Sequence, residues 1–218
     1  MSIAKTIIDA VTHHDRISAY LAQCRVVSET EGAETHVPPS KGEVISLIRF
    51  LRDQKTRPLV IGGVGVLNYL KGVDPQRGFR PTSDLDLWVD KVPVELPKGW
   101  TKDPEAVGVH SWVSPSGGYV DFLTPGHQFP GGEKLTVKVD PDPVTVYTEF
   151  PIASWLSILK LKLCSVREKD LADCIALVRA MGKVPGPDEL GKLNATQRDN
   201  LDLVNQWFKL RPVGNYGE

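Results

Sequence analysis

The most constraining feature of the sequence is a short segment in which two aspartates alternate with two leucines. Asp84 and Asp86 are separated by one residue, and Leu85 and Leu87 fill the alternate positions. Because strand side chains point alternately to opposite faces, this pattern predicts a strand with both carboxylates on one face and both leucines in a core. Neighbouring carboxylates repel each other and raise a pKa unless a cation lies between them. The segment therefore favours a strand that carries a cation site, and Mg2+ commonly takes one or two protein carboxylates together with substrate phosphates.

An apolar segment that ends in two glycines precedes this strand. Leu59, Val60 and Ile61 predict a buried strand, and Gly62 and Gly63 then lead into a helical segment. Glycines at a strand-to-helix turn let a phosphate approach the N–H groups at the helix N-terminus. They also serve in any tight turn, and the sequence leaves both interpretations open. The dinucleotide fingerprint lacks its third glycine, and no Gly-Lys-Ser/Thr completes a P-loop.

A loop of residues 72–83 joins the glycine turn to the acidic strand and carries Arg77 and Arg80. In one interpretation the loop is a plain connector. In the interpretation that we favour, its position brings its arginines close to a bound triphosphate. Arg80 and Ser83 are accordingly expected to bind the nucleotide, and Thr82 or Ser83 is expected to order the turn into the strand.

A third aspartate lies on a predicted hairpin. Residues 109–113 and 119–123 alternate in character on either side of a Ser-Pro-Ser-Gly-Gly turn, which is typical of a β-hairpin. Asp121 would point to an otherwise apolar face, an unusual position for a charge unless that face borders a cleft. An edge position in water is the alternative. Residues 135–139 and 144–148 predict two more short strands.

From residue 151 the apolar periodicity becomes helical. One apolar stripe comprises Ile152, Trp155, Leu156, Leu159 and Leu163. Lys162 flanks this stripe, where a lone lysine normally extends its charge into solvent. Asp170 and Asp173 lie in the first turn of the next predicted helix, where the helix dipole favours carboxylates. Residues 187–193 and 195–210 predict two further helices.

These motifs, in this order, resemble the nucleotidyltransferases of the DNA polymerase β superfamily. The glycine pair, the basic loop and Asp84-Leu85-Asp86-Leu87 are similar to the first signature of that superfamily, and Asp121 corresponds to its third carboxylate. Downstream, Lys162, Arg167 and Lys169-Asp170-x-x-Asp173 are similar to the AbiEii-like branch, which includes toxins of type IV toxin–antitoxin systems. The resemblance covers about residues 57–180.

The resemblance implies an α+β (mixed α/β) fold, with a small mixed β-sheet flanked by helices and followed by a C-terminal helical subdomain. Residues 1–150 would form the nucleotidyltransferase-like core with its N-terminal helices, and residues 151–218 would form the subdomain.

The resemblance also implies a Mg2+-dependent enzyme that moves an NMP from an NTP to an acceptor hydroxyl. Two Mg2+ ions would be held by three carboxylates, and the phosphates would be bound by the glycine turn, a loop arginine and a lysine. The implied catalytic residues are Asp84, Asp86, Asp121, Lys162 and Asp170; the nucleotide-binding residues are Gly62, Gly63, Arg80, Ser83 and Lys162; the metal ligands are Asp84, Asp86 and Asp121.

The implied acceptor is RNA, in particular a tRNA 3′ end, and an antitoxin protein is an implied partner. A small-molecule acceptor, as in antibiotic-modifying relatives, is the alternative enzyme. A nucleotide-binding or partner-binding module without catalysis is a third hypothesis, although all the expected carboxylates are present.

Composition sets further bounds. A net charge of −1 over 218 residues excludes a global basic field for nucleic acid. Cys24, Cys164 and Cys174 lack metal-type spacing, which favours buried thiols over disulfides. No apolar segment approaches the roughly 20 residues that span a bilayer, so no membrane partner is expected. The first residues lack the long apolar region of a signal peptide, and a cytoplasmic location is expected.

Overall fold

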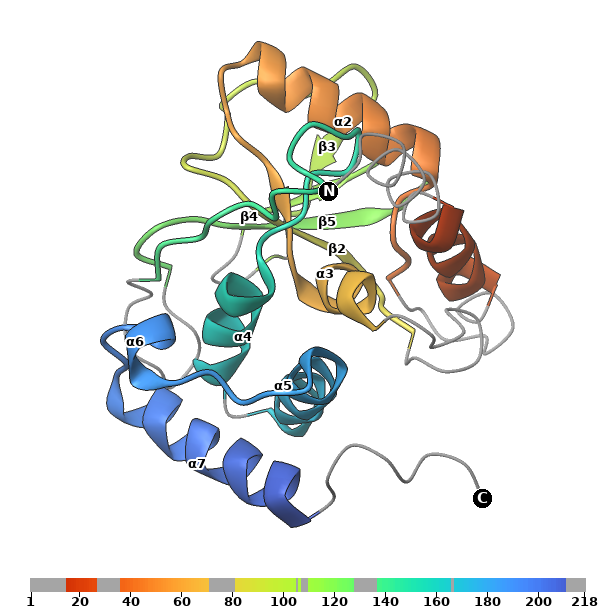
Figure 1. Ribbon diagram of the computed structural model, residues 1–218. Coiled ribbons are helices and arrows are strands. Elements are labelled where there is room, and N and C mark those ends of the chain that lie inside the picture. The colour runs from red at the N-terminus through yellow and green to blue at the C-terminus, as the bar shows by residue number, and fades with distance from the viewer. Residues whose placement is uncertain are drawn as a thin grey trace.

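The computed structural model of the protein describes residues 15–26, 36–70, 81–104, 106, 110–127, 137–165 and 167–210. Five strands in these ranges form one sheet, in the order β1-β2-β5-β4-β3. They are β1 (Leu59–Val60), β2 (Leu85–Trp88), β3 (Thr101–Lys102), β4 (His110–Val113) and β5 (Tyr119–Leu123). β2 and β5 are parallel, and the other neighbours are antiparallel. The mixed sheet and the helices around it confirm the predicted fold class (Figure 1).

The acidic strand has the two faces that its alternation predicts. Leu85 and Leu87 are fully buried, whereas Asp86 between them stays partly exposed. On the neighbouring strand, Val120 and Phe122 are buried in the same core, and Asp121 between them is partly exposed. Asp86 and Asp121 therefore share the opposite face of the sheet, on which Trp88 and Leu123 are also buried.

The predicted hairpin is also confirmed, because β4 and β5 pair around a tight turn. Ser114 N–H donates to the Gly118 carbonyl at 2.8 Å, and Gly117 has a φ of +79°, which favours glycine. Gly118 is needed for another reason, since a Cβ there would lie 2.4 Å from Cα of Pro39. Residues 36–40 are thus laid closely along the start of β5.

Helix α2 (Lys41–Asp53) begins with the reciprocal cap that its sequence indicates. The Ser40 hydroxyl accepts from the N–H of Glu43, and the Glu43 carboxylate accepts from the N–H of Ser40 at 2.8 Å. The same carboxylate accepts from the N–H and the hydroxyl of Ser116 in the β4–β5 turn. Glu43 therefore both caps a helix and fastens that helix to the hairpin.

We expect Glu43→Ala to lower the free energy of unfolding by about 1–2 kcal/mol at neutral pH. Hydrogen bonds from Ser116 and Ser40 outweigh burial and lower the pKa of Glu43 to about 2. A lowered pKa stabilises the folded state above the unfolded-state pKa, and this contribution is lost as pH falls toward 2. Urea denaturation at several pH values should show the deficit shrinking below about pH 4. Asp53→Ala, in the exposed last turn of α2, is the control, and a deficit of the same size at every pH would contradict the assignment.

Two helices lie on the side of the sheet opposite α2 (Figure 1). Helix α3 (Gly62–Tyr69) follows β1 directly, and α4 (Trp155–Leu163) is capped by the Ser154 hydroxyl. They pack closely because Gly65 leaves room for Ile158, whose Cδ1 lies 2.9 Å from the position that a Cβ on Gly65 would take.

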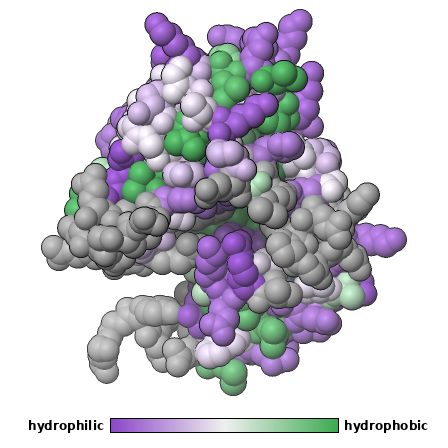
Figure 2. Space-filling view, turned by 180° about the vertical axis from the view of Figure 1, so that it is seen from behind, coloured by the Kyte–Doolittle hydropathy of each residue, from purple (hydrophilic) through white to green (hydrophobic). Residues whose placement is uncertain are grey.

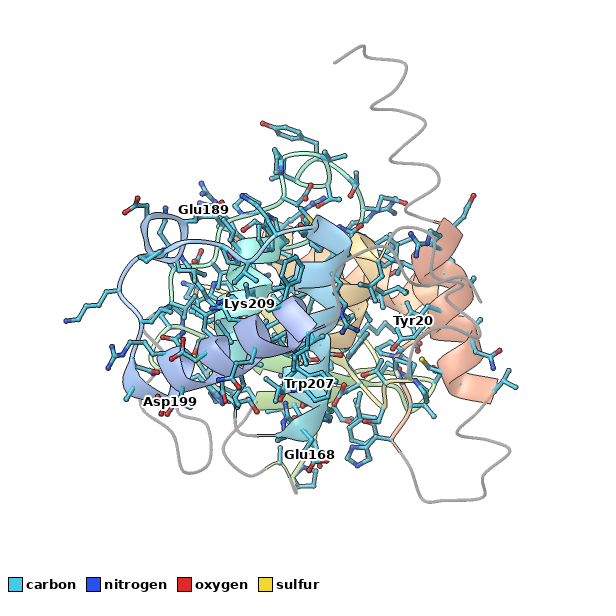
Figure 3. All side chains as sticks on the ribbon, turned by 60° about the horizontal axis from the view of Figure 1, so that its bottom comes forward. Tyr20, Glu168, Glu189, Asp199, Trp207 and Lys209 are labelled. Atoms are coloured by element: carbon cyan, nitrogen blue, oxygen red, sulfur yellow. The ribbon has the colours of Figure 1, made fainter. Side chains whose placement is uncertain are left out.

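The remaining helices are α5 (Glu168–Met181), α6 (Pro187–Leu190) and α7 (Ala195–Leu210). Asn194 and Gln197 cap α7 reciprocally, each side-chain oxygen accepting from the other residue's N–H. Figure 3 looks onto α7, which crosses α5, with Asp199 near its start and Lys209 near its end. The two helices predicted after residue 186 are therefore present. The predicted division at residue 150 stays a prediction, although one hydrophobic cluster includes residues from both sides of it.

The strand predicted at residues 144–148 is wrong, because this segment forms turns. The Asp142 carboxylate accepts from the N–H groups of Val144 and Thr145, and such a local bond competes with strand pairing. Within the other predicted strand, residues 137–139 have no regular structure, and residues 135–136 lie outside the described ranges.

Several other features agree with the sequence. The apolar residues Ile7, Ile8, Val11, Ile17, Leu21 and Cys24 predict a helix over residues 3–24. Residues 15–26 are helical, and the part of this helix before residue 15 lies outside the described residues. The three cysteines are free and buried. In the view from behind, hydrophilic residues project along the top of the face and form another group near its centre, and hydrophobic residues appear in smaller patches between them (Figure 2). None of the helices in the described part of the chain is long and apolar enough to cross a membrane.

Candidate active site

The sheet brings the predicted carboxylates together. Asp86 on β2 and Asp121 on β5 are direct partners in the parallel register. Strands in a sheet lie about 4.8 Å apart, and residues in register share a face. Asp84 lies in the bend just before β2, and its charge acts on both Asp86 and Asp121. Strand register thus brings Asp86 and Asp121 together, and the bend before β2 carries the third predicted metal ligand, Asp84.

The proximity of the three carboxylates has an electrostatic consequence. Burial, together with the negative charges of Asp84 and Asp121, raises the pKa of Asp86 to about 7, against the opposing charges of Lys162 and Arg167. Burial also raises the pKa of Asp121, and Asp84 adds to the rise. Three negative charges therefore meet at one place that holds too little positive charge to balance them.

Hydroxyl groups orient two of these carboxylates. The Thr82 hydroxyl donates to Asp84 at 3.0 Å, and the Ser111 hydroxyl donates to Asp121 at 2.5 Å. Ser111 is the register partner of Asp121 on β4, and the N–H of Asp103 bonds to the Ser111 carbonyl at 2.9 Å. Analysis of the sequence missed Ser111, although counting outward from the predicted hairpin turn places residue 111 opposite Asp121.

Gly62 forms the corner beside the acidic strand. Its φ is +61°, a conformation that side chains disfavour, and a Cβ there would lie 1.8 Å from Oδ2 of Asp86. Gly63 is less crowded, because its nearest neighbours would lie 3.6 Å from a Cβ. The first glycine of the pair is therefore required by the Asp86 carboxylate, in addition to any role toward phosphate.

We expect Gly62→Ala to lower the free energy of unfolding by roughly 2–3 kcal/mol, from backbone strain and the displacement of Asp86. The matched control is Gly182→Ala, since Gly182 has a φ of +69° and no atom within 4 Å of the place that its new methyl group would take. Chemical denaturation of both variants distinguishes the cost of backbone strain, which both variants share, from the cost of the collision with Asp86, which only Gly62→Ala has. Equal losses in the two variants would contradict a specific contact between Gly62 and Asp86.

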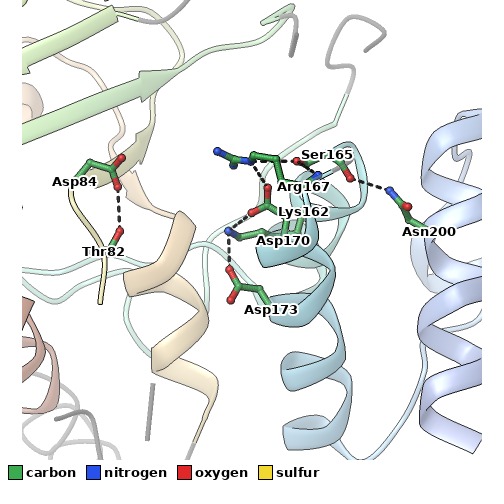
Figure 4. Close-up of polar contacts among 8 residues, drawn as sticks. All are labelled: Thr82, Asp84, Lys162, Ser165, Arg167, Asp170, Asp173 and Asn200. Atoms are coloured by element: carbon green, nitrogen blue, oxygen red, sulfur yellow. Dashed lines mark hydrogen bonds and ion pairs between the residues drawn. The ribbon is translucent and has the colours of Figure 1, made fainter. Parts of the chain in front are cut away.

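A buried ion-pair cluster lies next to the carboxylates (Figure 4). The Lys162 ammonium group contacts Asp170 at 2.6 Å and Asp173 at 2.8 Å. Its side chain is only 10% exposed, and the two aspartates are 1% and 3% exposed. Burial opposes the charge on Lys162, but Asp173, Asp170 and Asp86 outweigh that effect and raise the pKa of Lys162. Lys162 is thus held charged between the α5 aspartates and Asp86.

Arg167 completes this cluster at the corner between α4 and α5. Its Nε donates to Asp170 at 2.6 Å, while its side chain is 57% exposed. Burial opposes ionisation of Asp170, but Lys162 and Arg167 prevail and the pKa of Asp170 falls to about 2. Asp170 is therefore a buried counter-ion to two cations, and its catalytic role stays a prediction.

Helix α7 holds the same corner from the other side. The Asn200 amide donates to the carbonyls of Leu163 and Ser165, both at 2.9 Å, and the Gln197 amide donates to the Lys160 carbonyl at 3.0 Å. Carbonyls at a helix C-terminus have no partner within the helix. The α7 amides thus satisfy the end of α4 and fix the corner that carries Lys162 and Arg167.

The carboxylate chemistry fits a hard divalent cation only in part. Oxygen donors and raised pKa values suit Mg2+. In the described ranges, however, no three His, Cys, Asp or Glu side chains form a ready-made metal-binding group. A cation at these carboxylates would therefore complete its shell with substrate phosphates and water, as Mg2+ usually does.

Ser83 and Arg80 were also predicted to bind the nucleotide. Ser83 is exposed in the bend before β2, and it is Thr82 that bonds the acidic strand. Arg80 lies outside the described residues, as does Arg77, so their expected contact with phosphate stays a prediction.

A cavity of about 590 Å³ lies next to β4. It is lined by Lys91, Lys102, Asp103, His110, Ser111 and Trp112, among others. Ser111 belongs both to this lining and to the hydrogen bond with Asp121. Ser111 therefore borders both the cavity and the carboxylate cluster.

Comparison with known proteins leaves the family open. No protein-family profile and no curated protein match the chain. Among solved structures, the chain is similar to an antigenic nucleotidyltransferase-like protein from Paracoccidioides brasiliensis, with 18% identity and a TM-score of 0.45, over 80% of this chain and 93% of that one. A TM-score of this size supports no conclusion about function. The functional argument therefore depends on the arrangement of the side chains.

Proposed function

We propose that the protein is a nucleotidyltransferase that moves an NMP from an NTP to an acceptor hydroxyl with the help of Mg2+. The observation that carries this proposal is the register pairing of Asp86 with Asp121, with Asp84 in the bend just before β2 and Gly62 against Asp86. A cluster of carboxylates with raised pKa values next to a glycine corner suits phosphoryl chemistry, which depends mainly on positioning and charge neutralisation.

Each residue has a distinct part in the proposed reaction. Asp84, Asp86 and Asp121 would hold the metal, which supplies charge neutralisation on the triphosphate when it is bound. The acceptor oxygen bonds to the α-phosphorus while the bond from that phosphorus to the bridging oxygen breaks and pyrophosphate leaves. Asp121 takes the acceptor proton as the general base.

The cationic cluster would bind the leaving phosphates. Arg167 is half-exposed beside Asp86 and presents its guanidinium group at the corner (Figure 4). Lys162 contributes its charge through space, because its ammonium group is paired with Asp170 and Asp173. The N–H groups at the start of α3 would donate hydrogen bonds to a phosphate at the Gly62–Gly63 corner.

The acceptor that we propose is RNA, in particular a tRNA 3′ end, with an antitoxin protein as a partner. Support comes from the resemblance of the Lys162, Arg167 and Lys169-Asp170-x-x-Asp173 pattern to the AbiEii-like branch. A second candidate is a small polar acceptor, which the cavity next to Ser111 favours because its volume of about 590 Å³ is typical of small-molecule sites.

The experiment is incubation of the protein with each α-labelled NTP, Mg2+ and total RNA, beside a control without RNA. Label in RNA supports the RNA acceptor, and label only in small molecules supports the second candidate. A parallel reaction with γ-labelled NTP should transfer no label, and label carried from the γ-phosphate to an acceptor would show a kinase reaction and contradict the proposal. Absence of transfer from every NTP to either class of acceptor would contradict catalysis.

A further inference from the structure

Two aromatic rings are stacked beside the carboxylate cluster. The rings of His36 and Tyr119 have centroids 3.6 Å apart and planes inclined by 4°. Tyr119 lies two residues before Asp121 on β5 and so points to the same face of the sheet. It also immediately precedes the register pair of Leu85 with Val120, which puts it next to Asp84. The stack therefore borders the proposed reaction site.

The backbone holds the His36 segment against the hairpin. The Val37 carbonyl accepts from the N–H of Tyr119 at 2.8 Å, and Val37 forms a parallel bridge with Gly118. Arg25 ties the segment to the hairpin turn by donating to the carbonyls of Pro38 and Ser116. His36 itself is exposed. An aromatic ring is thus presented to solvent on a backbone that is fixed in place.

The His36 imidazole interacts electrostatically with Asp121, which indicates that the ring lies near that carboxylate. Burial raises the pKa of Asp121; the Ser111 hydroxyl and the His36 imidazole are among the groups that oppose the rise. If Asp121 takes the acceptor proton, as proposed above, a group that binds next to His36 belongs to the acceptor.

We propose that the His36–Tyr119 stack binds the unpaired nucleobase at the 3′ end of a single-stranded RNA acceptor. The outer face of His36 stacks on the base, and the terminal ribose then lies toward Asp121. Aromatic side chains stack on single-stranded bases with little dependence on sequence, because every base has a π-face. This inference rests on the proposed function and specifies its acceptor as a nucleic-acid end.

The test measures the affinity of the full chain, without NTP, for a short fluorescent single-stranded RNA and for the same RNA with an abasic 3′-terminal ribose. Wild-type protein should bind the abasic RNA roughly 5- to 150-fold more weakly, which is the range for loss of one stacked base. His36→Ala should bind both RNAs equally, at the weaker affinity.

Two variants separate stacking from other roles. His36→Phe keeps a flat ring without the imidazole, so it should retain the distinction between the two RNAs. Tyr147→Ala, which removes an aromatic side chain that is 94% exposed, should behave like wild type. A distinction that persists in His36→Ala, or is lost in His36→Phe, would overturn the stack as the binding surface.

Failure of this inference is distinguishable from failure of the proposed function. If wild-type protein transfers label to RNA yet binds the two RNAs equally, the stacking surface is overturned and the nucleotidyltransferase stands. If replacement of Asp84 or Asp86 leaves transfer intact while the two RNAs are still distinguished, the carboxylate site is overturned and the stacking surface stands as a base-binding site.

Discussion

Asp84→Asn and Asp86→Asn should each reduce NMP transfer by a factor on the order of 10³ or more, because each removes a negative charge that would hold the metal on the reacting phosphates. The measurement is the rate of transfer of α-labelled nucleotide at saturating NTP. Asp199→Asn, on the exposed surface of α7, is the control and should leave the rate unchanged. Incorporation at the wild-type rate in both site variants would rule out the assignment.

The same Asp86 substitution should have the opposite effect on stability. The pKa of Asp86 is raised to about 7, above the unfolded value of about 3.9, so the folded state loses stability as pH rises between these two values. Asp86→Asn should therefore stabilise the metal-free protein by on the order of 1–4 kcal/mol above about pH 7, and by little near pH 4. Loss of activity together with a gain in stability is expected of a residue kept for function.

The second large effect is expected at Lys162. Lys162→Met should lower the free energy of unfolding by about 3–5 kcal/mol, because it leaves buried carboxylates without their cation. Asp170 and Asp173 are 1% and 3% exposed, so water cannot replace the ammonium group. Lys160→Met, on the same helix, is the control and should cost much less.

The pH dependence distinguishes this cause from a simple packing defect. In the wild type the pKa of Asp170 is lowered to about 2, so its ionised form stabilises the fold above the unfolded pKa of about 3.9. Without Lys162 the buried charges are costly, and protonation relieves them. The deficit of Lys162→Met should shrink as pH falls toward 4, and Lys162→Met combined with Asp173→Asn should be more stable than Lys162→Met alone. A deficit independent of pH would indicate packing instead.

The sequence was most informative where chemistry and local geometry coincide. Alternation at residues 84–87 predicts which face carries the carboxylates, and the hairpin period places Asp121 on a strand. The parallel pairing that brings Asp121 level with Asp86 depends on contacts between distant segments. Periodicity along the chain carries no information about that register.

Other features follow only from tertiary contacts. Lys162 was predicted to bind phosphate, but whether its charge is paired depends on how α5 packs against α4. Gly62 was predicted as a phosphate turn, and the closeness of Asp86 gives a second, independent reason for glycine there. Residues 144–148 have the composition of a strand, yet the Asp142 carboxylate between two prolines holds them in turns.

We propose that Asp84, Asp86 and Asp121 together hold a metal-bound triphosphate at the Gly62 corner. The most direct measurement is anomalous diffraction from crystals grown with Mn2+ and a non-hydrolysable NTP analogue. The account predicts an anomalous peak within coordination distance of Asp84 and Asp86, with the α-phosphate facing Asp121. A bound nucleotide whose Mn2+ lies elsewhere, or a triphosphate remote from these aspartates, would contradict it.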